Sequence, residues 1–410
     1  MPDALIIDAC RSPRGVGKPG KGALSELHPQ RIMSGVLKGL EARNDLDTTE
    51  VDDVIIGCSS QRGKQGACIG RMSVLDAGWH TQASAFTLDR FCGSGITTAN
   101  LAAANIMSGM EDCTVAGGVE QMSYTGTLQG EVATMDMGNM HLRGMHPQPH
   151  QGICADIIAT LEGFSREELD QLGVISQERA KHAIDNGHFD KALVPIYKDD
   201  GTLALDREEF PRPGTTMESL AGLNPVFPAY MDVPIDATGE TFTQLVQRAY
   251  PDLDINHVHH AGNSSGVVDG AAAILMASPE FAQAKGWKPR ARVVAMATAG
   301  GSPTLMLNEP GPAARKALKK AGMTFDDIDL FEVNEAFAVV LAKFLRDTGV
   351  DHDKVNVNGG AMALGHPIAA TGSMLIGTAL DELERQDKQT ALITMCTGGG
   401  MAPAIIIERV

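Results

Sequence analysis

Residues 93–118 read GSGITTANLAAANIMSGMEDCTVAGG, and this stretch decides the fold. Its glycines open an alanine-rich segment that predicts a helix to about Met110, and residues 114–118 predict a strand that ends in glycines. The same order returns near the C-terminus. There Thr371-Gly372-Ser373 opens a predicted helix to about Arg385, and the strand 392–396 precedes another glycine run. The chain therefore contains one α/β unit twice.

The correspondence extends outward from both copies. Short apolar strands are predicted at 4–9 and 291–296, near the start of each half. A helical stretch then leads into a strand at 51–56 and again at 325–330. Three matched pieces in one order indicate an internal repeat. Strands that alternate with helices predict mainly parallel sheets with helices on both faces.

Three regions follow from this pattern. Residues 1–120 form an N-terminal half, which we expect residues 264–288 to complete, and residues 289–410 form the C-terminal half. Between them, 121–263 is an inserted loop domain, with helices expected near 165–187 and 241–249. Ser165 followed by Glu168 predicts a capping box at the first of these helices. A loop-rich insertion between two rigid units is a natural place for substrate contacts.

Composition narrows the classes of function. The net charge of −17 argues against nucleic acid or an anionic membrane as the main partner, because both need a basic surface. No apolar run of about 18 residues is present, so no membrane span is expected. The first residues predict a strand rather than a signal peptide. The seven cysteines are odd in number and contain no Cys-x-x-Cys, which indicates a reducing, cytoplasmic setting without disulfides or structural zinc.

Two cysteines lie in settings that suit chemistry. Cys92 stands before the helix that Gly93 opens, where unpaired N–H groups and the helix dipole favour a thiolate and could hold an oxyanion. Cys396 ends an apolar strand before three glycines, so it could move a proton at carbon beside a flat ligand. Each has an alternative interpretation as a small buried structural thiol.

His366 and Asn334 are further candidates. His366 lies between Gly365 and Pro367, in a constrained loop ahead of a helix, and a neutral imidazole there could accept a thiol proton. Asn334 follows a predicted strand and precedes a helix expected from Glu335. It could cap that helix or hold a water in an oxyanion site. For His366 the alternative is a histidine satisfied by backbone groups in a turn.

The histidines of residues 257–260 could suggest a metal site. No further ligands follow at recognisable spacing, so none is expected. The glycine runs match neither a Walker motif nor a dinucleotide fingerprint.

Taken together, these segments resemble the thiolase family over nearly the whole chain. The resemblance is carried, in order, by 89–95, 116–123, 261–266, 334–338, 365–367 and 396–400. It implies a five-layered α/β/α/β/α core with an inserted loop domain. It also implies an acyl-CoA:CoA C-acyltransferase that cleaves a 3-ketoacyl-CoA with CoA, or condenses two acyl-CoA units in reverse.

By the same resemblance, Cys92 attacks the keto carbon and His366 is its base. Cys396 protonates the departing carbanion and later deprotonates the second CoA. One oxyanion site then uses His366 and a water held by Asn334, and the other uses the N–H groups of Cys92 and Gly398. Coenzyme A is a co-substrate, and no permanently bound cofactor is expected.

The CoA contacts are also inferred from resemblance. They place Arg212 and Ser219 near the nucleotide end of CoA, Ser265 beside the pantetheine arm and Phe337 along the tunnel. His150 opens the motif that, in many family members, reads His-Met-Gly-x-Thr-Ala-Glu. Here that motif reads HQGICAD over 150–156, so the methionine where the family forms its acyl pocket is replaced by Gln151. Residues of roughly 228–259 also form a longer link than is usual.

Two alternative functions and two kinds of partner remain. A decarboxylative ketoacyl synthase shares a related fold but lacks the second catalytic cysteine, and a non-catalytic acyl-CoA-binding relative would be expected to lose site residues that are present here. Family members are usually dimers or tetramers, so a homodimer or homotetramer is expected, and association with a hydratase/dehydrogenase subunit is compatible with catalysis. Acyl chain length and physiological direction do not follow from the sequence.

Overall fold

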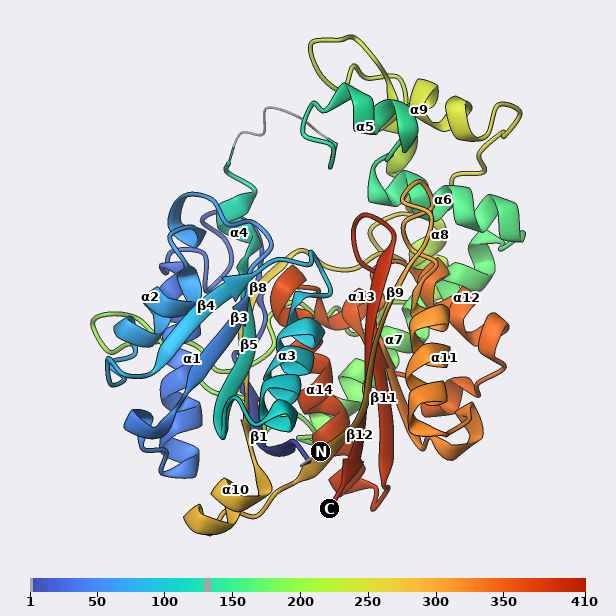
Figure 1. Ribbon diagram of the computed structural model, residues 1–410. Coiled ribbons are helices and arrows are strands. Elements are labelled where there is room, and N and C mark those ends of the chain that lie inside the picture. The colour runs from blue at the N-terminus through green and yellow to red at the C-terminus, as the bar shows by residue number, and fades with distance from the viewer. Residues whose placement is uncertain (1–2, 129–133) are drawn as a thin grey trace.

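The computed structural model describes residues 3–128 and 134–410, and its core is one long sheet in two halves (Figure 1). The N-terminal half contains β4 (Ser84–Leu88), β3 (Asp53–Gly57), β5 (Cys113–Gln121), β8 (Val268–Ala277) and β1 (Leu5–Arg11), in that order. The C-terminal half continues with β9 (Ala291–Gly300), β12 (Met401–Arg409), β11 (Thr390–Thr394) and β10 (Leu330–Val333). Within the described residues, two residue pairs between β1 and β9 connect the two halves of the sheet.

Helices cover both faces of each half, which gives five layers. The central layer contains α3 (Ser94–Ser108) and α14 (Ile368–Arg385), which pack on each other and on strands of both halves. On the outer faces lie α1 (Pro29–Asn44) and α2 (Ile69–Asp76) on one side, and α11 (Pro310–Ala321) and α12 (Ala338–Thr348) on the other. The predicted α/β/α/β/α arrangement is therefore confirmed.

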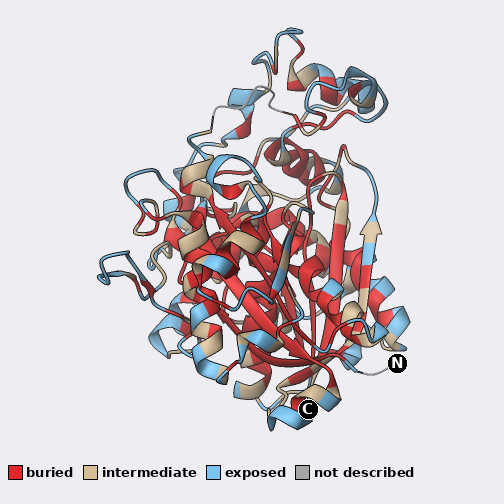
Figure 2. Ribbon diagram, turned by 60° about the vertical axis from the view of Figure 1, so that its left-hand side comes forward, coloured by how far each residue is buried: buried red, intermediate tan, exposed pale blue. Residues whose placement is uncertain are grey.

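Successive side chains explain why the strands are apolar throughout. Ile55 of β3 packs into the central layer, whereas its neighbours Val54 and Ile56 pack against the outer helices. In β12, Ile405 and Ile407 face the central layer and Ile406 faces α11 and α12. Because a strand alternates its side chains between faces, a strand buried on both sides must be apolar at every position. Figure 2 shows this buried core as a continuous red interior.

The internal repeat is confirmed strand by strand. The order β3, β5, β8, β1 corresponds to β10, β11, β12, β9, with the same parallel and antiparallel pairings. Even β4, which pairs with β3 in parallel, has a counterpart in a parallel bridge between Phe331 and Val355.

The expectation of mainly parallel sheets is wrong. Only β3–β4, β3–β5 and β10–β11 are parallel, and the other pairs of the long sheet are antiparallel. The reason is the connection at the end of each half. A short glycine segment turns β11 straight back into β12, and β8 returns from the insertion to run against β5. Alternation of strands and helices does not reveal these last connections.

The region between β5 and β8 is mostly helices and loops. The helices expected near 165–187 and 241–249 are confirmed as α7 (Arg166–Asp185) and α9 (Phe242–Ala249), and the capping box at Ser165 is present. The region also contains α4 (Met122–Thr125), α5 (Met140–Met145), α6 (Gln151–Glu162), α8 (Met217–Ala221), β6 (Ile196–Tyr197) and β7 (Leu203–Leu205). The remaining elements are β2 (Gly15–Val16), α10 (Pro279–Lys285) and α13 (Ala361–Leu364), with short 3-10 turns. We propose that the N-terminal half ends at 120, that the inserted loop domain spans 121–263 and that the C-terminal half begins at 289. Within the described residues, no helix is both long and apolar enough to cross a bilayer.

A buried arginine holds the outer part of this region together. The side chain of Arg143, on α5, has no exposed surface and makes ion pairs with Asp136 at 2.9 Å, Asp236 at 2.8 Å and Glu240 at 3.4 Å. Glu240 also pairs with Arg248 of α9. The cluster thus connects the segment 134–146 to the loop before α9, within the long link at 228–259.

Replacement of Arg143 by methionine is expected to loosen this outer region. Removing one partner of a buried ion pair leaves carboxylates without compensation, at a cost of about 3–5 kcal/mol. Here we expect about 2 kcal/mol, since Asp236 lies near solvent and water screens it. Hydrogen exchange should speed up at α5 and α9 while β5 and β12 stay protected, and equal protection of α5 in both proteins would contradict the assignment.

Candidate active site

The two repeated helices bring their N-termini together at glycines. A side chain on Gly95 of α3 would lie 2.6 Å from the backbone nitrogen of Ser373, and one on Gly372 of α14 would lie 2.3 Å from that of Ile96. Only glycine permits this approach. Because Cys92 precedes α3 and His366 precedes α14, the crossing places both candidates on the same side of the central layer.

Cys92 lies immediately before Gly93, the N-cap of α3, as expected, and only 4% of it is exposed. Phe91 adopts φ 48°, an uncommon backbone for a residue with a side chain, which marks a tight turn into the cysteine. Burial raises the pKa of the Cys92 thiol to about 12, although the backbone N–H groups of Cys92 and Gly398 act to lower it. The sequence predicts that the helix terminus favours a thiolate, and burial acts against that effect. Loss of hydration outweighs the helix terminus, so a base has to take the proton.

Asn334 and Cys396 are adjacent because β10 and β11 are parallel. Val333 is paired with Thr394, and the backbone N–H of Asn334 donates to the Thr394 carbonyl at 3.2 Å. The carboxyl ends of parallel strands meet at one edge, so Cys396 follows beside Asn334. Cys396 is 1% exposed, and its pKa is raised by burial and further by the nearby Cys92 sulfur. The two thiols therefore share one site.

His366 is fixed by contacts to both ring nitrogens. Its Nδ1 lies 2.6 Å from the Thr371 hydroxyl of α14, and its Nε2 lies 3.4 Å from the Asn334 Nδ2. As placed, the amide N–H₂ of Asn334 donates, which leaves the lone pair on Nε2 and the proton on Nδ1. Burial lowers the pKa of His366 to about 3, and the charge of Arg14 adds to this. A neutral imidazole that keeps its lone pair on Nε2 is the form that can accept a thiol proton.

Asn334 does not cap a helix. The helix expected from Glu335 starts instead at Ala338, because its N-cap Phe337 is extended and forms a bridge with the loop at Ser264. The Asn334 side chain turns toward His366, and its Oδ1 is buried without a hydrogen-bond partner in the described part of the chain. That oxygen is a free acceptor inside the site.

The buried neutral histidine predicts acid sensitivity of folding. An unfolded His366 titrates near the ordinary histidine pKa of 6.5, whereas the folded residue has a pKa of about 3. Between these values the unfolded chain binds more protons, so stability is full above pH 6.5 and falls as pH falls toward 3. At pH 5 the free energy of unfolding is therefore lower by about 2 kcal/mol because of this one group. Urea unfolding of wild type and His366→Asn between pH 5 and pH 7 measures it. We expect a smaller pH dependence in the variant, and equal slopes would contradict the assignment.

Gly398 is in close contact with the cysteine turn. A Cβ on Gly398 would lie 2.7 Å from Met135 Cε and 3.0 Å from the ring of Phe91. The absence of a side chain lets the Gly398 N–H reach the Cys92 sulfur, where it acts to lower the pKa of the thiol. The predicted pair of N–H groups, from Cys92 and Gly398, is therefore brought together.

Three of the predicted CoA-contact residues line two adjoining cavities. Arg212 and Ser219 border a cavity of about 240 Å³, and Arg212 and Ser265 border one of about 410 Å³. Phe210, Arg212 and Ala261 are common to both walls. Arg212 is exposed, with its guanidinium over the ring of Phe210 at 5.5 Å. The pair of cavities offers two cations, Arg212 and Lys18, and an aromatic face in an acidic protein.

The other two candidates belong to an aromatic cluster deeper in the fold. Phe337 is buried and lies 5.9 Å from Phe227 between ring centroids. His150 is the N-cap of α6, where its Nδ1 accepts from the Gly152 N–H. Its ring stacks on Tyr230 at 5.5 Å and contacts Phe227. The buried Cys396 packs in the same apolar cluster as Phe337.

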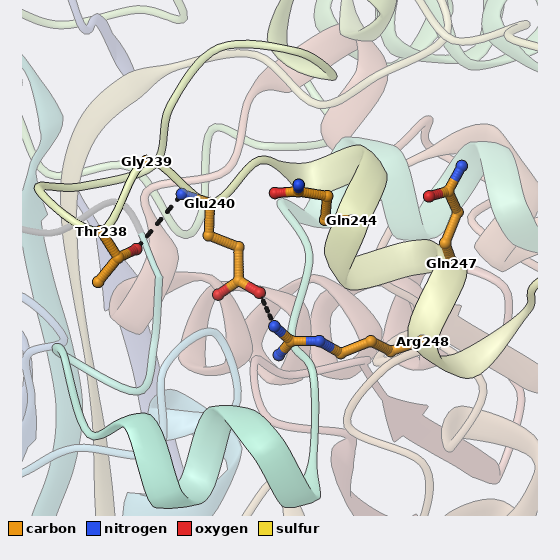
Figure 3. A pocket seen from close by; sticks show the side chains of 6 residues that line it. All are labelled: Thr238, Gly239, Glu240, Gln244, Gln247 and Arg248. Atoms are coloured by element: carbon orange, nitrogen blue, oxygen red, sulfur yellow. Dashed lines mark hydrogen bonds and ion pairs between the residues drawn. The ribbon is translucent and has the colours of Figure 1, made fainter.

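Another cavity, of about 520 Å³, lies elsewhere. Figure 3 shows it along α9, lined by Thr238, Gly239, Glu240, Gln244, Gln247 and Arg248. Both charged side chains on its wall are paired with each other. None of the candidate catalytic residues borders this cavity, so we do not assign the reaction to it.

The histidines of 257–260 are held by carboxylates. Asp156 accepts from Nδ1 of both His257 and His259, and Asp170 lies 2.8 Å from Nε2 of His260. No group of three or more His, Cys, Asp or Glu side chains within 3–128 and 134–410 is arranged as a metal site.

Sequence reasoning missed two residues that act on His366. In the sequence Thr371 marks only the start of a helix, yet its hydroxyl orients the ring. Arg14 lies near the opposite end of the chain and makes a buried pair with Glu208, at 2.7 Å. The spacing of five between His366 and Thr371, one turn into a helix, could have indicated the first. Nothing local could have indicated the second.

Comparison with known proteins decides the family. Residues 4–230 match the family described as thiolase, N-terminal domain, and residues 287–409 match that described as thiolase, C-terminal domain. The chain belongs to the thiolase family. This thiolase is 38% identical, over its whole length and 95% of the relative, to the steroid 3-ketoacyl-CoA thiolase FadA6 of Mycobacterium tuberculosis. It is 37% identical to the 3-oxoadipyl-CoA/3-oxo-5,6-dehydrosuberyl-CoA thiolase of Escherichia coli, with complete coverage of both chains.

The structure agrees with these relatives. The crystal structure of the Bacillus anthracis acetyl-CoA acetyltransferase superposes on this thiolase with a TM-score of 0.84 and 31% identity, covering 100% of this chain and 99% of the other. The predicted family, fold and enzyme class, an acyltransferase, are therefore confirmed. The ketoacyl-synthase and binding-protein alternatives are not favoured.

Proposed function

We propose that this thiolase cleaves a 3-ketoacyl-CoA longer than four carbons, through an acyl group on Cys92. CoA-dependent cleavage, or condensation in reverse, is the reaction that its family membership supports. The observation that carries the residue assignment is the meeting of two buried thiols, a neutral histidine and a buried amide at the ends of α3, α14, β10 and β11.

In the first half-reaction His366 takes the Cys92 proton through Nε2. The thiolate attacks the keto carbon, and the developing oxyanion is held by N–H groups. Burial raises the pKa of the resting thiol, so the thiolate forms only when a base takes this proton. Cys396 then protonates the acetyl-CoA carbanion as the C–C bond breaks.

In the second half-reaction CoA removes the acyl group. Cys396, now a thiolate, takes the thiol proton of CoA, and the CoA sulfur attacks the thioester. The bond between the acyl group and Cys92 breaks, and the Cys92 sulfur takes back its proton from His366. The N–H groups of Cys92 and Gly398 are set to receive the oxyanion of this step, and Asn334 with His366 serves the other oxyanion site. Coenzyme A is the co-substrate, bound along Arg212, Ser219 and Ser265, beside the two adjoining cavities. Phe337 and His150 line the way to the sulfur.

The acyl group is proposed to be larger than acetoacetyl for two reasons. Gln151 replaces the methionine of the family motif, at the first turn of α6, beside the aromatic cluster of His150. The long link at 228–259 contributes Tyr230 to the same cluster. The relatives named for a steroid and for 3-oxoadipyl substrates also act on groups beyond four carbons. Degradation is the proposed direction.

The test is thiolysis of 3-ketoacyl-CoAs of increasing chain length, followed by loss of the enolate absorbance. We expect kcat/KM to rise beyond acetoacetyl-CoA. A strict preference for acetoacetyl-CoA would overturn the length assignment, and no cleavage of any substrate by folded protein would overturn the function.

We further propose a homodimer or homotetramer, which a hydratase/dehydrogenase subunit could join. The support is the edge of the sheet, where β4 pairs with β3 alone in the described residues and leaves Phe86 37% exposed. An unpaired edge with an exposed aromatic side chain invites pairing with a second copy. Sedimentation velocity decides this, and a monomer at micromolar concentration would contradict it.

A further inference from the structure

A buried aspartate binds one ring nitrogen of a histidine and leaves the other ring nitrogen without a partner. Asp156, on α6, is itself fully buried. Its Oδ1 lies 2.7 Å from Nδ1 of His259 and also accepts the His259 backbone N–H at 3.0 Å. Its Oδ2 lies 2.6 Å from Nδ1 of His257, nearer the surface. Because a carboxylate only accepts, the proton of the His259 ring is on Nδ1.

The other nitrogen of His259 has no partner. His259 has no exposed surface, and its Nε2 is buried without a hydrogen bond among the described residues. With the proton on Nδ1, the neutral ring presents a lone pair at Nε2, on the side away from Asp156. Buried polar atoms are nearly always satisfied, so an acceptor held this firmly and left free indicates a missing donor.

The neighbours of His259 place that acceptor beside the proposed acyl path. Its ring meets Phe337 edge to face, with centroids 5.6 Å apart. Phe337 in turn contacts Phe227, and both pack in the cluster that contains Cys396. An aromatic ring offers no N–H or O–H group, so these neighbours cannot donate a hydrogen bond to Nε2. The ring of His259, with its unpartnered nitrogen, therefore lies next to the aromatic cluster that borders the proposed acyl path.

We propose that His259, oriented by Asp156, accepts a hydrogen bond through Nε2 from a donor on the bound acyl thioester. Two donors share this chemistry: a hydroxyl on the acyl chain and an amide N–H of the pantetheine arm. A carboxylate-bearing acyl chain is disfavoured, because it has no proton to donate and the Asp156 charge lies directly behind the ring. The proposal rests on the proposed thiolase reaction, since it concerns the same tunnel.

The test measures binding apart from turnover. Titration calorimetry on Cys92→Ala protein, with and without His259→Phe, uses two acyl-CoAs of equal length, one plain and one hydroxylated on its distal chain. If His259→Phe weakens binding of the hydroxylated ligand alone, by about tenfold, the donor is the hydroxyl on the acyl chain. An equal loss for both ligands, and for free CoA, assigns it to the pantetheine arm. Unchanged affinities for all three would overturn the proposal.

Two further variants separate this role from general damage. Asp156→Asn removes the charge that fixes the ring, so it should weaken the same ligands in the same pattern, which marks Asp156 as a positioning residue. His188→Phe alters a half-buried histidine bonded to Asn358 on another face, and no ligand should bind differently. Thiolysis by the wild-type protein is measured separately. Selective binding without any thiolysis would overturn the proposed function and leave the role of His259 standing.

Discussion

Replacement of Cys92 by alanine is expected to stop thiolysis, with kcat lower by about 10⁴-fold or more. No other thiol can take over, because the acyl group has to form on the sulfur that the N–H groups of Cys92 and Gly398 surround. Intact mass after mixing with a 3-ketoacyl-CoA, without free CoA, should show an acyl adduct in wild type and none in the variant. The adduct mass should follow the acyl chain supplied.

Cys113→Ala is the matched control. Cys113 is also buried, but it lies in the outer core of the N-terminal half. It should retain the adduct and its turnover. An adduct that persists in Cys92→Ala would place the nucleophile elsewhere, whereas adduct loss in both variants would indicate a general effect on folding, which a thermal melt would show.

Replacement of Cys396 by alanine is expected to lower thiolysis by about 10²- to 10⁴-fold, the range for loss of a general acid or base. The loss should be selective for steps at carbon. Exchange of the methyl protons of acetyl-CoA with deuterated water needs a base beside the carbon and should disappear. Acyl transfer from a plain acyl-CoA to Cys92 breaks no C–H or C–C bond and should be retained better.

The pair of variants distinguishes the two thiols. Cys92→Ala removes the adduct, and Cys396→Ala keeps it when a plain acyl-CoA is the donor. Because Cys92 raises the pKa of Cys396, the two sulfurs influence each other, and the double variant should be little worse than Cys92→Ala alone. Retained proton exchange in Cys396→Ala would assign the carbon acid–base role to another group.

Local pattern was enough to place most of the chemistry. The residues that carry the resemblance flank strands and helices that the sequence predicts, so Cys92 before α3 and His366 before α14 were found where expected. The repeat was visible because each half needs the same apolar strands and the same glycine contact, which at Gly95 and Gly372 admits no side chain. Helix limits were less accurate at Asn334, where contacts with a distant loop keep the chain extended.

The sequence by itself determined the family and the order of the elements, and it indicated the side chains that we propose as reactive, because these depend on short-range pattern. Only the tertiary structure decided strand direction, the protonation of Cys92 and His366, and the meeting of Arg212, Ser219 and Ser265 at adjoining cavities. Each of these depends on burial or on contacts between residues far apart in the chain. Desolvation is a property of what surrounds a group, so no motif can state that a thiol at a helix terminus stays protonated.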